Sequence, residues 1–125
     1  MKHLITGGSG FLGNLIARRL HARGEQVRIL DVWEDVSRPE GIEFVKCDIR
    51  DAADVARAMK GVDVVHHNVA LVPLTKAGPE FWSVNVEGSR IAAEQSVKPA
   101  EWARKSVPYL LKLSARDNGK PLTAP

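Results

Sequence analysis

The fold of this 125-residue chain is decided at Thr6-Gly7-Gly8-Ser9-Gly10-Phe11-Leu12-Gly13. A predicted strand over residues 2–6, apolar at Leu4 and Ile5, leads into this stretch. A helical pattern follows over residues 11–23, where leucine and isoleucine recur at three- and four-residue spacings, and Gly24 is placed to end the helix. The sequence therefore predicts a strand, a tight turn and a helix in succession.

The three spaced glycines of this stretch suit a ligand-binding turn. Gly7 permits the tight turn, Gly10 lets the backbone approach a ligand, and Gly13 lets the helix pack close to the sheet. The unpaired backbone amides at the helix start, which include those of Phe11 and Leu12, are predicted to face a bound pyrophosphate. Taken alone, such glycines are equally consistent with turn geometry and no ligand.

The rest of the chain alternates strand-like and helical segments. Strands are predicted over residues 26–31, 43–48 and 62–66, and helices over residues 51–60 and about 80–97. This alternation is typical of an α/β fold with a parallel sheet, and right-handed crossovers predict the strand order 3-2-1-4. We expect a Rossmann-type, doubly wound sheet that is truncated after its fourth strand.

Several details of these elements are open to checking. Asp51, with Asp54 three residues later, is expected to accept hydrogen bonds from free amides at a helix start. Strand 62–66 is an apolar run that suits a strand covered on both faces. Phe81 and Trp82 are expected to pack on a helix face rather than against a substrate. The inward side of the helix over residues 51–60 is predicted to consist of Ala52, Val55, Ala56 and Met59.

Composition and charge narrow the class of protein. A chain of 125 residues holds about one domain. Without a signal peptide or an apolar run of about 20 residues, we expect a cytoplasmic protein with no membrane partner. Residues 1–97 carry 12 Lys and Arg against 13 Asp and Glu, whereas residues 98–125 carry 6 against 2. The basic charge thus belongs to a divergent tail, 98–125, and nucleic acid is not an expected partner.

No metal site is expected. Cys47 is the single cysteine, so it can form no internal disulfide, and it is predicted to be a buried small hydrophobe. His66 and His67 are adjacent on a predicted strand and therefore point to opposite faces, with no ligand cluster around them. We interpret them as ordinary histidines at a strand end.

An acidic residue is placed to choose the cofactor. Asp31 lies 18 residues after Gly13, at the predicted end of the second strand. Its carboxylate can accept hydrogen bonds from the hydroxyls of an adenosine ribose and would repel a 2′-phosphate, which favours NAD over NADP. A solvated strand end is the plain structural alternative, and Arg28, Trp33 and Arg38 nearby leave NADP open.

In order and spacing, these features resemble the N-terminal half of the extended short-chain dehydrogenase/reductases, the NAD-dependent epimerase/dehydratase family. The resemblance covers about residues 1–97. The glycine stretch is similar to the family's TGxxGxxG, and Asp31 to its acidic ribose-binding residue. The resemblance implies an NAD-binding domain over residues 1–97 and a nucleotide-sugar-like hydroxyl or carbonyl substrate.

The same resemblance implies further cofactor contacts. Asp48 and Ile49 match the pair that flanks the adenine ring in the family. The segment His66-His67-Asn68-Val69-Ala70 resembles the one that lines the cofactor's ribose, with Asn68, Val69 and Ala70 as its expected contacts. Asn85, in Asn85-Val86-Glu87-Gly88, is similar to the asparagine of the family's NVxG. All of these are expected to be cofactor-binding residues.

The family's catalytic pair has no match in this sequence. The family uses a Tyr and a Lys four residues later, but the single tyrosine, Tyr109, is followed at that spacing by Leu113. Lys112 misses the helical spacing, and nothing distinguishes Ser106 or Ser114 as a helper hydroxyl. We therefore assign no catalytic residue and expect this chain alone to bind the adenosine diphosphate half of the cofactor weakly.

Two questions stay open at this point. The chain is expected to be the cofactor-binding part of an NAD-dependent epimerase, dehydratase or reductase, with a non-catalytic dinucleotide-binding or interaction module as the alternative. From Gln95 onward the sequence does not match the family's fifth strand. Either a changed reading frame or a natural short protein would explain this. Residues 107–113 are apolar and can supply a substitute fifth strand, without which the sheet edge could self-associate.

Overall fold

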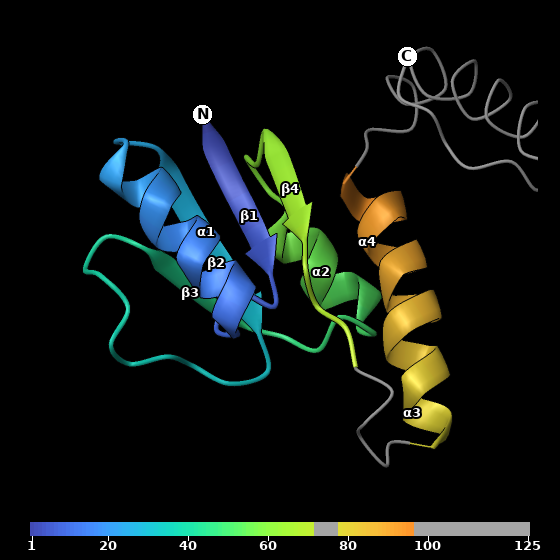
Figure 1. Ribbon diagram of the computed structural model, residues 1–125. Coiled ribbons are helices and arrows are strands. Elements are labelled where there is room, and N and C mark those ends of the chain that lie inside the picture. Colours follow the sequence, from blue (N-terminus) through green and yellow to red (C-terminus); the bar gives the residue numbers. More distant parts are fainter. Residues whose placement is uncertain (72–77, 97–125) are drawn as a thin grey trace, which may run out of the picture.

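The computed structural model describes residues 1–71 and 78–96, which form a four-stranded parallel sheet with helices on both faces (Figure 1). The strands are β1 (Lys2–Thr6), β2 (Gln26–Asp31), β3 (Glu43–Lys46) and β4 (Val64–His67). The helices are α1 (Phe11–Ala22), α2 (Ala52–Ala58), α3 (Pro79–Trp82), a π-helical segment η1 (Ser83–Glu87) and α4 (Gly88–Ser96). The order β3-β2-β1-β4 confirms the predicted Rossmann-type topology.

Two cores lie on opposite faces of the sheet, because successive strand residues point to opposite sides. On one face, Ile5, Val27 and Ile29 pack with Ala17 of α1 and with Ile42. On the other face α2 packs against α4 (Figure 1). The buried residues of this larger core are Leu4, Leu30, Cys47, Ile49, Val55, Ala58, Met59, Ile91 and Ala92. Burial of Cys47 confirms its predicted role as a small hydrophobe.

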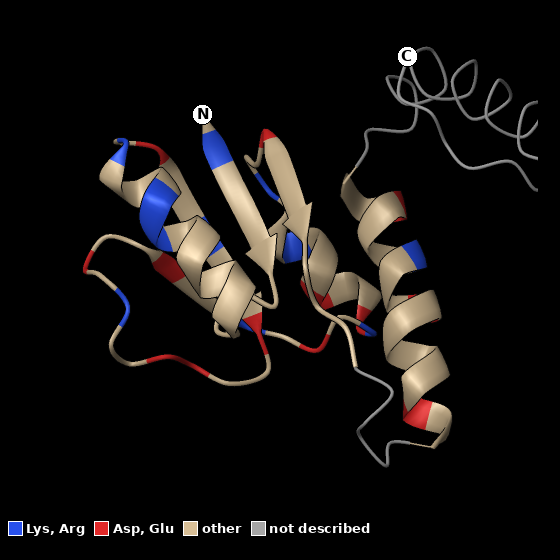
Figure 2. Ribbon diagram, viewed as in Figure 1, with Lys and Arg blue, Asp and Glu red and all other residues tan. Residues whose placement is uncertain are grey.

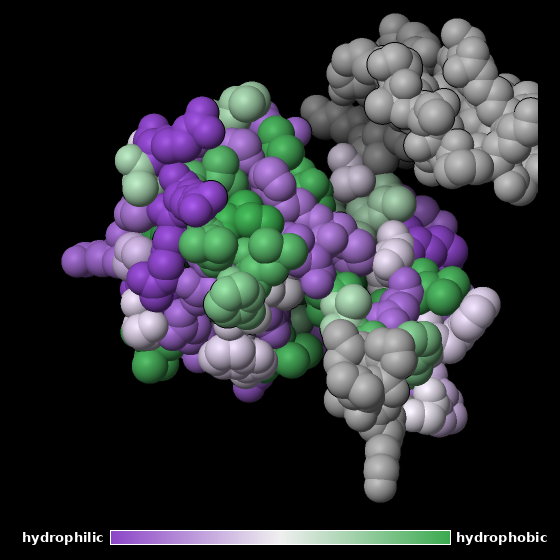
Figure 3. All heavy atoms as spheres, viewed as in Figure 1, coloured by the Kyte–Doolittle hydropathy of each residue, from purple (hydrophilic) through white to green (hydrophobic). Residues whose placement is uncertain are grey.

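Helix α1, predicted from its periodicity, is buried most deeply at small residues, and Ile16 and Leu20 are partly buried against the same core. Gly13 and Ala17 are its buried residues, while Leu12 and Leu15 are 56% and 42% exposed. The small side lets the helix approach the sheet closely, which turns the larger side chains outward. With Phe11, these leucines form an apolar patch on the outer face of α1 (Figure 3).

Helix α2 begins as expected, and its inward side differs in part from the predicted one. The Asp51 carboxylate accepts a hydrogen bond from the Asp54 amide at 3.0 Å, which confirms the predicted cap. The prediction for Ala52 is wrong, since that residue is exposed, and Ala56 is half-buried. Val55 and Met59 are buried as predicted, and Ala58 lies on the inward side with them. Small residues hide the true side of a helix because alanine suits either environment.

The long helix predicted over residues 80–97 is divided into α3, η1 and α4. Pro79 lies at its first turn as expected. Phe81 and Trp82 were expected to pack, but they are 39% and 63% exposed. Gly88 packs directly on Ile49, because a Cβ at Gly88 would lie 2.6 Å from the Ile49 Cγ2 atom. This close contact holds α4 to the end of β3.

Strand β4 forms one edge of the described sheet. It begins two residues later than predicted, and its Val64 and Val65 are only half-buried, so it is not covered on both faces. Its single strand neighbour among the described residues is β1. The substitute strand over residues 107–113, the domain limit at residue 97, and Tyr109 all lie outside the described residues. Self-association through β4 stays a prediction.

Charged side chains of both signs are interleaved along the described elements (Figure 2). Many form ion pairs, among them Arg28–Glu43 at 2.6 Å and Arg90–Glu94 at 2.6 Å. Within residues 1–71 and 78–96, no helix has the length and apolar character needed to cross a membrane.

Candidate functional site

The candidate site lies where the carboxyl ends of the parallel strands meet. Thr6, the last residue of β1, is in register with Leu30 of β2 and with His67 of β4. The segments that follow each strand therefore come together at one edge of the sheet, as ligand sites in open α/β sheets do. The glycine turn, the end of β2 and the loop after β4 are brought side by side.

Gly7 and Gly13 are glycines because the fold leaves no room for a side chain. Gly7 has a φ of +66°, and a Cβ there would lie 2.8 Å from the Val69 amide nitrogen. A Cβ on Gly13 would lie 2.3 Å from the Gly7 carbonyl oxygen. The helix thus rests on the turn itself, which refines the expected packing of Gly13 near the sheet.

Gly10 differs from these two glycines. A Cβ there would meet just one atom within 4 Å, the Gly7 carbonyl oxygen at 3.4 Å. Gly10 begins α1 without a side-chain cap. The first amides of the helix, those of Phe11, Leu12 and Gly13, have no hydrogen-bond acceptor among the described residues. Such amides at a helix start attract an anion, as predicted for this turn.

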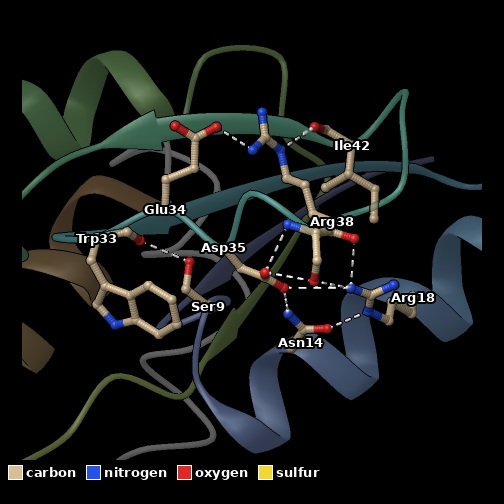
Figure 4. Close-up of polar contacts among 9 residues, drawn as sticks. Ser9, Asn14, Arg18, Trp33, Glu34, Asp35, Arg38 and Ile42 are labelled. Carbon is tan, nitrogen blue, oxygen red and sulfur yellow. Dashed lines mark hydrogen bonds and ion pairs between the residues drawn. The ribbon is translucent and has the colours of Figure 1, made fainter.

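Asp31 is built into the glycine turn. Its carboxylate accepts hydrogen bonds from the Ser9 amide at 3.0 Å and from the Val32 amide at 2.8 Å. Asp31 is 8% exposed. The Ser9 hydroxyl donates to the Trp33 carbonyl at 2.8 Å, so one residue of the turn holds both the end of β2 and the chain beyond it (Figure 4). The carboxylate oxygens keep further lone pairs for hydroxyl donors.

The loop between β2 and β3 docks on α1 through Asp35 (Figure 4). The Asp35 carboxylate accepts from the Asn14 amide group at 2.5 Å and pairs with Arg18 at 3.4 Å. Its other oxygen accepts from the amide and hydroxyl of Ser37, at 2.9 and 2.7 Å. These donors, those of Ser37 first, lower the pKa of Asp35 to about 2. The loop is thereby held by a carboxylate that stays ionised.

The other arginines near the end of β2 are also engaged. Arg38 pairs with Glu34, and its Nε donates to the Ile42 carbonyl at 3.0 Å (Figure 4). Arg28 pairs with Glu43 and donates to carbonyls at the end of α2. Each cation that left NADP open in the sequence therefore has an acidic partner.

The loop after β4 is fixed from two sides. The Asn68 amide donates to the Thr6 hydroxyl at 3.1 Å, and Val69 packs on Gly7. The Asn85 side chain binds both backbone groups of Leu71, accepting from its amide at 2.7 Å and donating to its carbonyl at 2.8 Å. Ala70, between these anchors, is exposed. The predicted site residues of this loop are thus brought against the glycine turn, with Asn85 as their support.

Asp48 and Ile49 follow β3 at the same edge of the sheet. The Asp48 carboxylate pairs with Arg50 at 2.7 Å, and this partner lowers the pKa of Asp48. The Ile49 side chain is buried against Gly88. Both side chains are therefore engaged within the protein. Their expected place beside an adenine ring stays a prediction.

The two adjacent histidines point to opposite faces, as expected. His66 stacks on His3 with ring centroids 5.3 Å apart, and His67 bonds to Thr6 and to Ser89. No cluster of three or more His, Cys, Asp or Glu side chains in residues 1–71 and 78–96 is arranged to hold a metal ion.

The sequence analysis missed the residues that support the site. Ser9, Asp35 and Asn14 were not predicted as site residues. Thr6 and His67 were not either, although both lie in segments that carry the family resemblance. Ser9 and Thr6 lie within the quoted glycine stretch, so their polar side chains were a usable signal. Asp35 and Asn14 meet only because α1 and the β2–β3 loop pack together, and no local pattern marks that contact.

A family model described as the "3-beta hydroxysteroid dehydrogenase/isomerase family" matches residues 4–106. The protein y4nG of Sinorhizobium fredii is 43% identical over 94 residues, which cover 75% of this chain and 24% of that protein. The 3 beta-hydroxysteroid dehydrogenase/Delta 5→4-isomerase of monkeypox virus is 36% identical over 96 residues, covering 70% of this chain and 28% of the enzyme.

Solved structures share the described fold. The UDP-glucose 4-epimerase of Thermus thermophilus, in complex with NAD, superposes with a TM-score of 0.67 at 33% identity, covering 76% of this chain and 33% of the epimerase. The chain therefore spans about a quarter to a third of the length of the proteins it matches. The similarity to an enzyme solved with NAD agrees with the geometry at the glycine turn.

Proposed function

Because this chain belongs to the 3-beta hydroxysteroid dehydrogenase/isomerase family, we propose that it binds NAD at the glycine turn as the N-terminal portion of a dehydrogenase or epimerase. The observation that carries this proposal is the combination of Gly10 with the free amides of α1. Gly7 and Gly13 are required by the fold, whereas nothing in the described protein requires a glycine at Gly10. The missing side chain leaves room beside the amides, which suits the close approach of a diphosphate.

The proposed roles of the chain's own residues follow from their positions. The amides of Phe11, Leu12 and Gly13 would hold the diphosphate, and the Asp31 carboxylate would accept from the adenosine ribose hydroxyls. The loop Asn68-Val69-Ala70, held by Asn85, would line the next part of the cofactor. When bound, NAD supplies a hydride acceptor for the oxidation of a substrate alcohol. The domain that performs this binding is proposed to extend to about residue 97.

NAD is proposed over NADP on electrostatic grounds. A 2′-phosphate at the end of β2 would approach the Asp31 carboxylate, whose repulsion grows as water is excluded. Recognition of that phosphate requires an available cation. Arg18 and Arg38 are instead paired with Asp35 and Glu34. The site therefore offers the ribose an acceptor and offers a phosphate no free partner among these arginines.

The substrate of the whole enzyme is proposed to be an alcohol or ketone. Relatives by sequence are named hydroxysteroid dehydrogenases, which favours a sterol-type alcohol. The nucleotide-sugar substrate expected from the sequence has its support in solved structures such as UDP-glucose 4-epimerase. We propose no catalytic residue within residues 1–71 and 78–96, since none of the described residues forms a Tyr–Lys pair.

Calorimetric titration of the chain with NAD and with ADP tests the cofactor proposal. We expect both to bind, because the diphosphate and adenosine contacts are shared. Gly10→Val fills the space beside the free amides and is expected to weaken both ligands by about tenfold or more. Asp31→Ala should weaken NAD binding and reduce the ratio of the affinity for NAD to the affinity for NADP. Absence of binding by the unmodified chain, or equal binding by Gly10→Val, would overturn the proposed site.

A further inference from the structure

A chain of hydrogen bonds runs from the glycine turn to α4 through His67. The Thr6 hydroxyl lies 2.8 Å from the His67 Nδ1 atom, and the His67 Nε2 atom lies 2.9 Å from the Ser89 hydroxyl. The Ser89 hydroxyl lies 2.6 Å from the Asn85 carbonyl oxygen. Asn85 is the residue whose side chain holds Leu71. The four residues come from β1, β4, α4 and η1.

The direction of each hydrogen bond follows from the chemistry of its ends. A carbonyl oxygen only accepts, so Ser89 donates its proton to Asn85 and must accept from the His67 Nε2 atom. At the other end, the Thr6 hydroxyl accepts from the Asn68 amide at 3.1 Å and from the Val69 amide at 3.4 Å. Both of its lone pairs are used, so its proton goes to the Nδ1 atom of His67. The chain of bonds requires a neutral His67 with its proton on Nε2.

Protonation of His67 would break this arrangement. An N–H on Nδ1 would point at a Thr6 oxygen whose lone pairs already serve two amides. Thr6 is fully buried, so it has no water to turn to. The Thr6 hydroxyl oxygen would have to give up one of the two amides. The Asn68 amide also donates to the Thr6 backbone carbonyl at 3.2 Å, so the Val69 amide is the one that would lose its acceptor. Val69 packs against Gly7, so the loop after β4 would lose contact with the glycine turn at the same point.

We propose that neutral His67 is a positioning residue that holds the loop after β4 against the glycine turn, and that its protonation releases this loop and weakens dinucleotide binding. The second part rests on the proposed function. The first part concerns the protein alone. Together they give the site a dependence on pH.

The surroundings of His67 contain no opposing charge among the described residues. β1 presents Thr6 and α4 presents Ser89, both neutral. The charged groups of η1 and α4 pair with one another, Arg90 with Glu87 and with Glu94. On its own strand, His66 faces the opposite side of the sheet, where it stacks on His3, which lies 3.7 Å from Glu25. Partial burial of the ring between β1 and α4 lowers the pKa of His67, while the residue as a whole stays exposed.

The first test needs no cofactor. Nitrogen-15 NMR of the histidine rings distinguishes the two neutral tautomers, and we expect the Nε2–H form for His67 at pH 7.5. Amide hydrogen exchange then follows the loop, and we expect protection of the Val69 amide to fall when His67 titrates, whereas the Asn68 amide keeps the Thr6 backbone carbonyl as its acceptor. An Nδ1–H tautomer, or protection unchanged through that titration, would overturn the positioning role.

The second test measures the affinity for NAD across pH. We expect the wild-type affinity to fall several-fold from pH 7.5 to pH 5.5. His67→Asn keeps an acceptor for Thr6 but cannot titrate, so it should bind within a few-fold of wild type at pH 7.5 and lose its pH dependence. His67→Phe removes the acceptor and should bind about tenfold more weakly at both pH values.

The control is His66→Asn, which alters the neighbouring histidine on the other face and should keep the wild-type pH dependence. Persistence of the acid loss in His67→Asn, or its disappearance in His66→Asn, would overturn the proposed link to binding. If the wild-type chain binds no NAD at pH 7.5, the proposed function fails. The NMR and exchange measurements still decide the role of His67 in that case.

Discussion

The two halves of the candidate site are held together by different chemistry. At the end of β2, carboxylates do the holding: Asp31 binds the glycine turn through Ser9, and Asp35 binds α1 through Asn14. After β4, neutral groups take over, with Asn85 bonded to the backbone of Leu71. The side at the end of β2 is thus held by carboxylates, whereas the side after β4 is held by a neutral side chain and backbone amides. With the role proposed for His67, the half after β4 is the one expected to respond to pH.

The largest effect is expected at Gly13, because it packs on the glycine turn and this turn contacts both halves of the site. Gly13→Ala places a Cβ 2.3 Å from the Gly7 carbonyl oxygen and 2.8 Å from the Gly8 Cα atom, so backbone must move. We expect the free energy of unfolding to drop by about 3 kcal/mol or more, measured by urea denaturation. Gly10→Ala is the matched control and should cost less than about 1 kcal/mol, since its nearest contact is 3.4 Å. Equal stability of the two variants would contradict this account of the turn.

A smaller effect is expected from a change confined to the half after β4. Asn85→Ala removes two hydrogen bonds to Leu71 and leaves two backbone groups without their partner. We expect a loss of about 2 kcal/mol in the free energy of unfolding, together with faster hydrogen exchange of the Leu71 amide. Ser96→Ala, which removes an exposed contact near the end of α4, is the control. A Leu71 amide equally protected in Asn85→Ala would show that other contacts hold the loop.

Acid should separate the two halves without any substitution. Burial is the main cause that lowers the pKa of His66 and of His67 from the ordinary value of 6.5. Below pH 6.5 the unfolded chain therefore binds more protons than the folded one. Their contribution to stability is complete above about pH 6.5 and is lost as the pH falls through the lowered values. Asp35, with its pKa lowered to about 2 from 3.8, keeps its contribution until the pH falls below about 4.

Thermal melts at pH 7.5, 5.5 and 3.0 measure this separation. We expect a first decrease in melting temperature between pH 7.5 and 5.5 and a further decrease toward pH 3.0. The double variant His66→Asn/His67→Asn should lose the first decrease and keep the second. A single decrease confined to the region below pH 4 would remove the histidines from the explanation.

The smallest effect is expected from the half held by carboxylates. Asp35→Asn preserves the shape of the side chain but leaves the Arg18 charge without its acidic partner. We expect the affinity for NADP relative to NAD to rise by about threefold, because the freed cation is exposed to solvent. Glu87→Gln, which disturbs an ion pair of Arg90 instead, should leave this ratio unchanged. A ratio unaffected by Asp35→Asn would leave Asp31 as the sole acidic determinant.

The same division separates what the sequence could and could not predict. The strand order and the glycine turn were predictable, because Gly7 and Gly13 are demanded by backbone geometry and the alternation of elements restricts the topology. The periodicity of α1 predicted the helix, but it could not tell that Gly13 and Ala17 are its fully buried residues, with Ile16 and Leu20 partly buried beside them. Asn85 was found through a resemblance, but its bond to Leu71 depends on the division of one predicted helix at η1. The contacts of Asp35 and His67 join segments distant in sequence, which no local pattern marks.

The buried Cys47 thiol can serve as a chemical probe of opening of the core. Cys47 is 4% exposed, and burial is the main cause that raises the pKa of its thiol to about 11. Very little reactive thiolate therefore exists at neutral pH. Alkylation of this single thiol must therefore wait for the core between β3 and α2 to open. The rate of thiol labelling would therefore report how often this core opens, and the measurement needs no ligand.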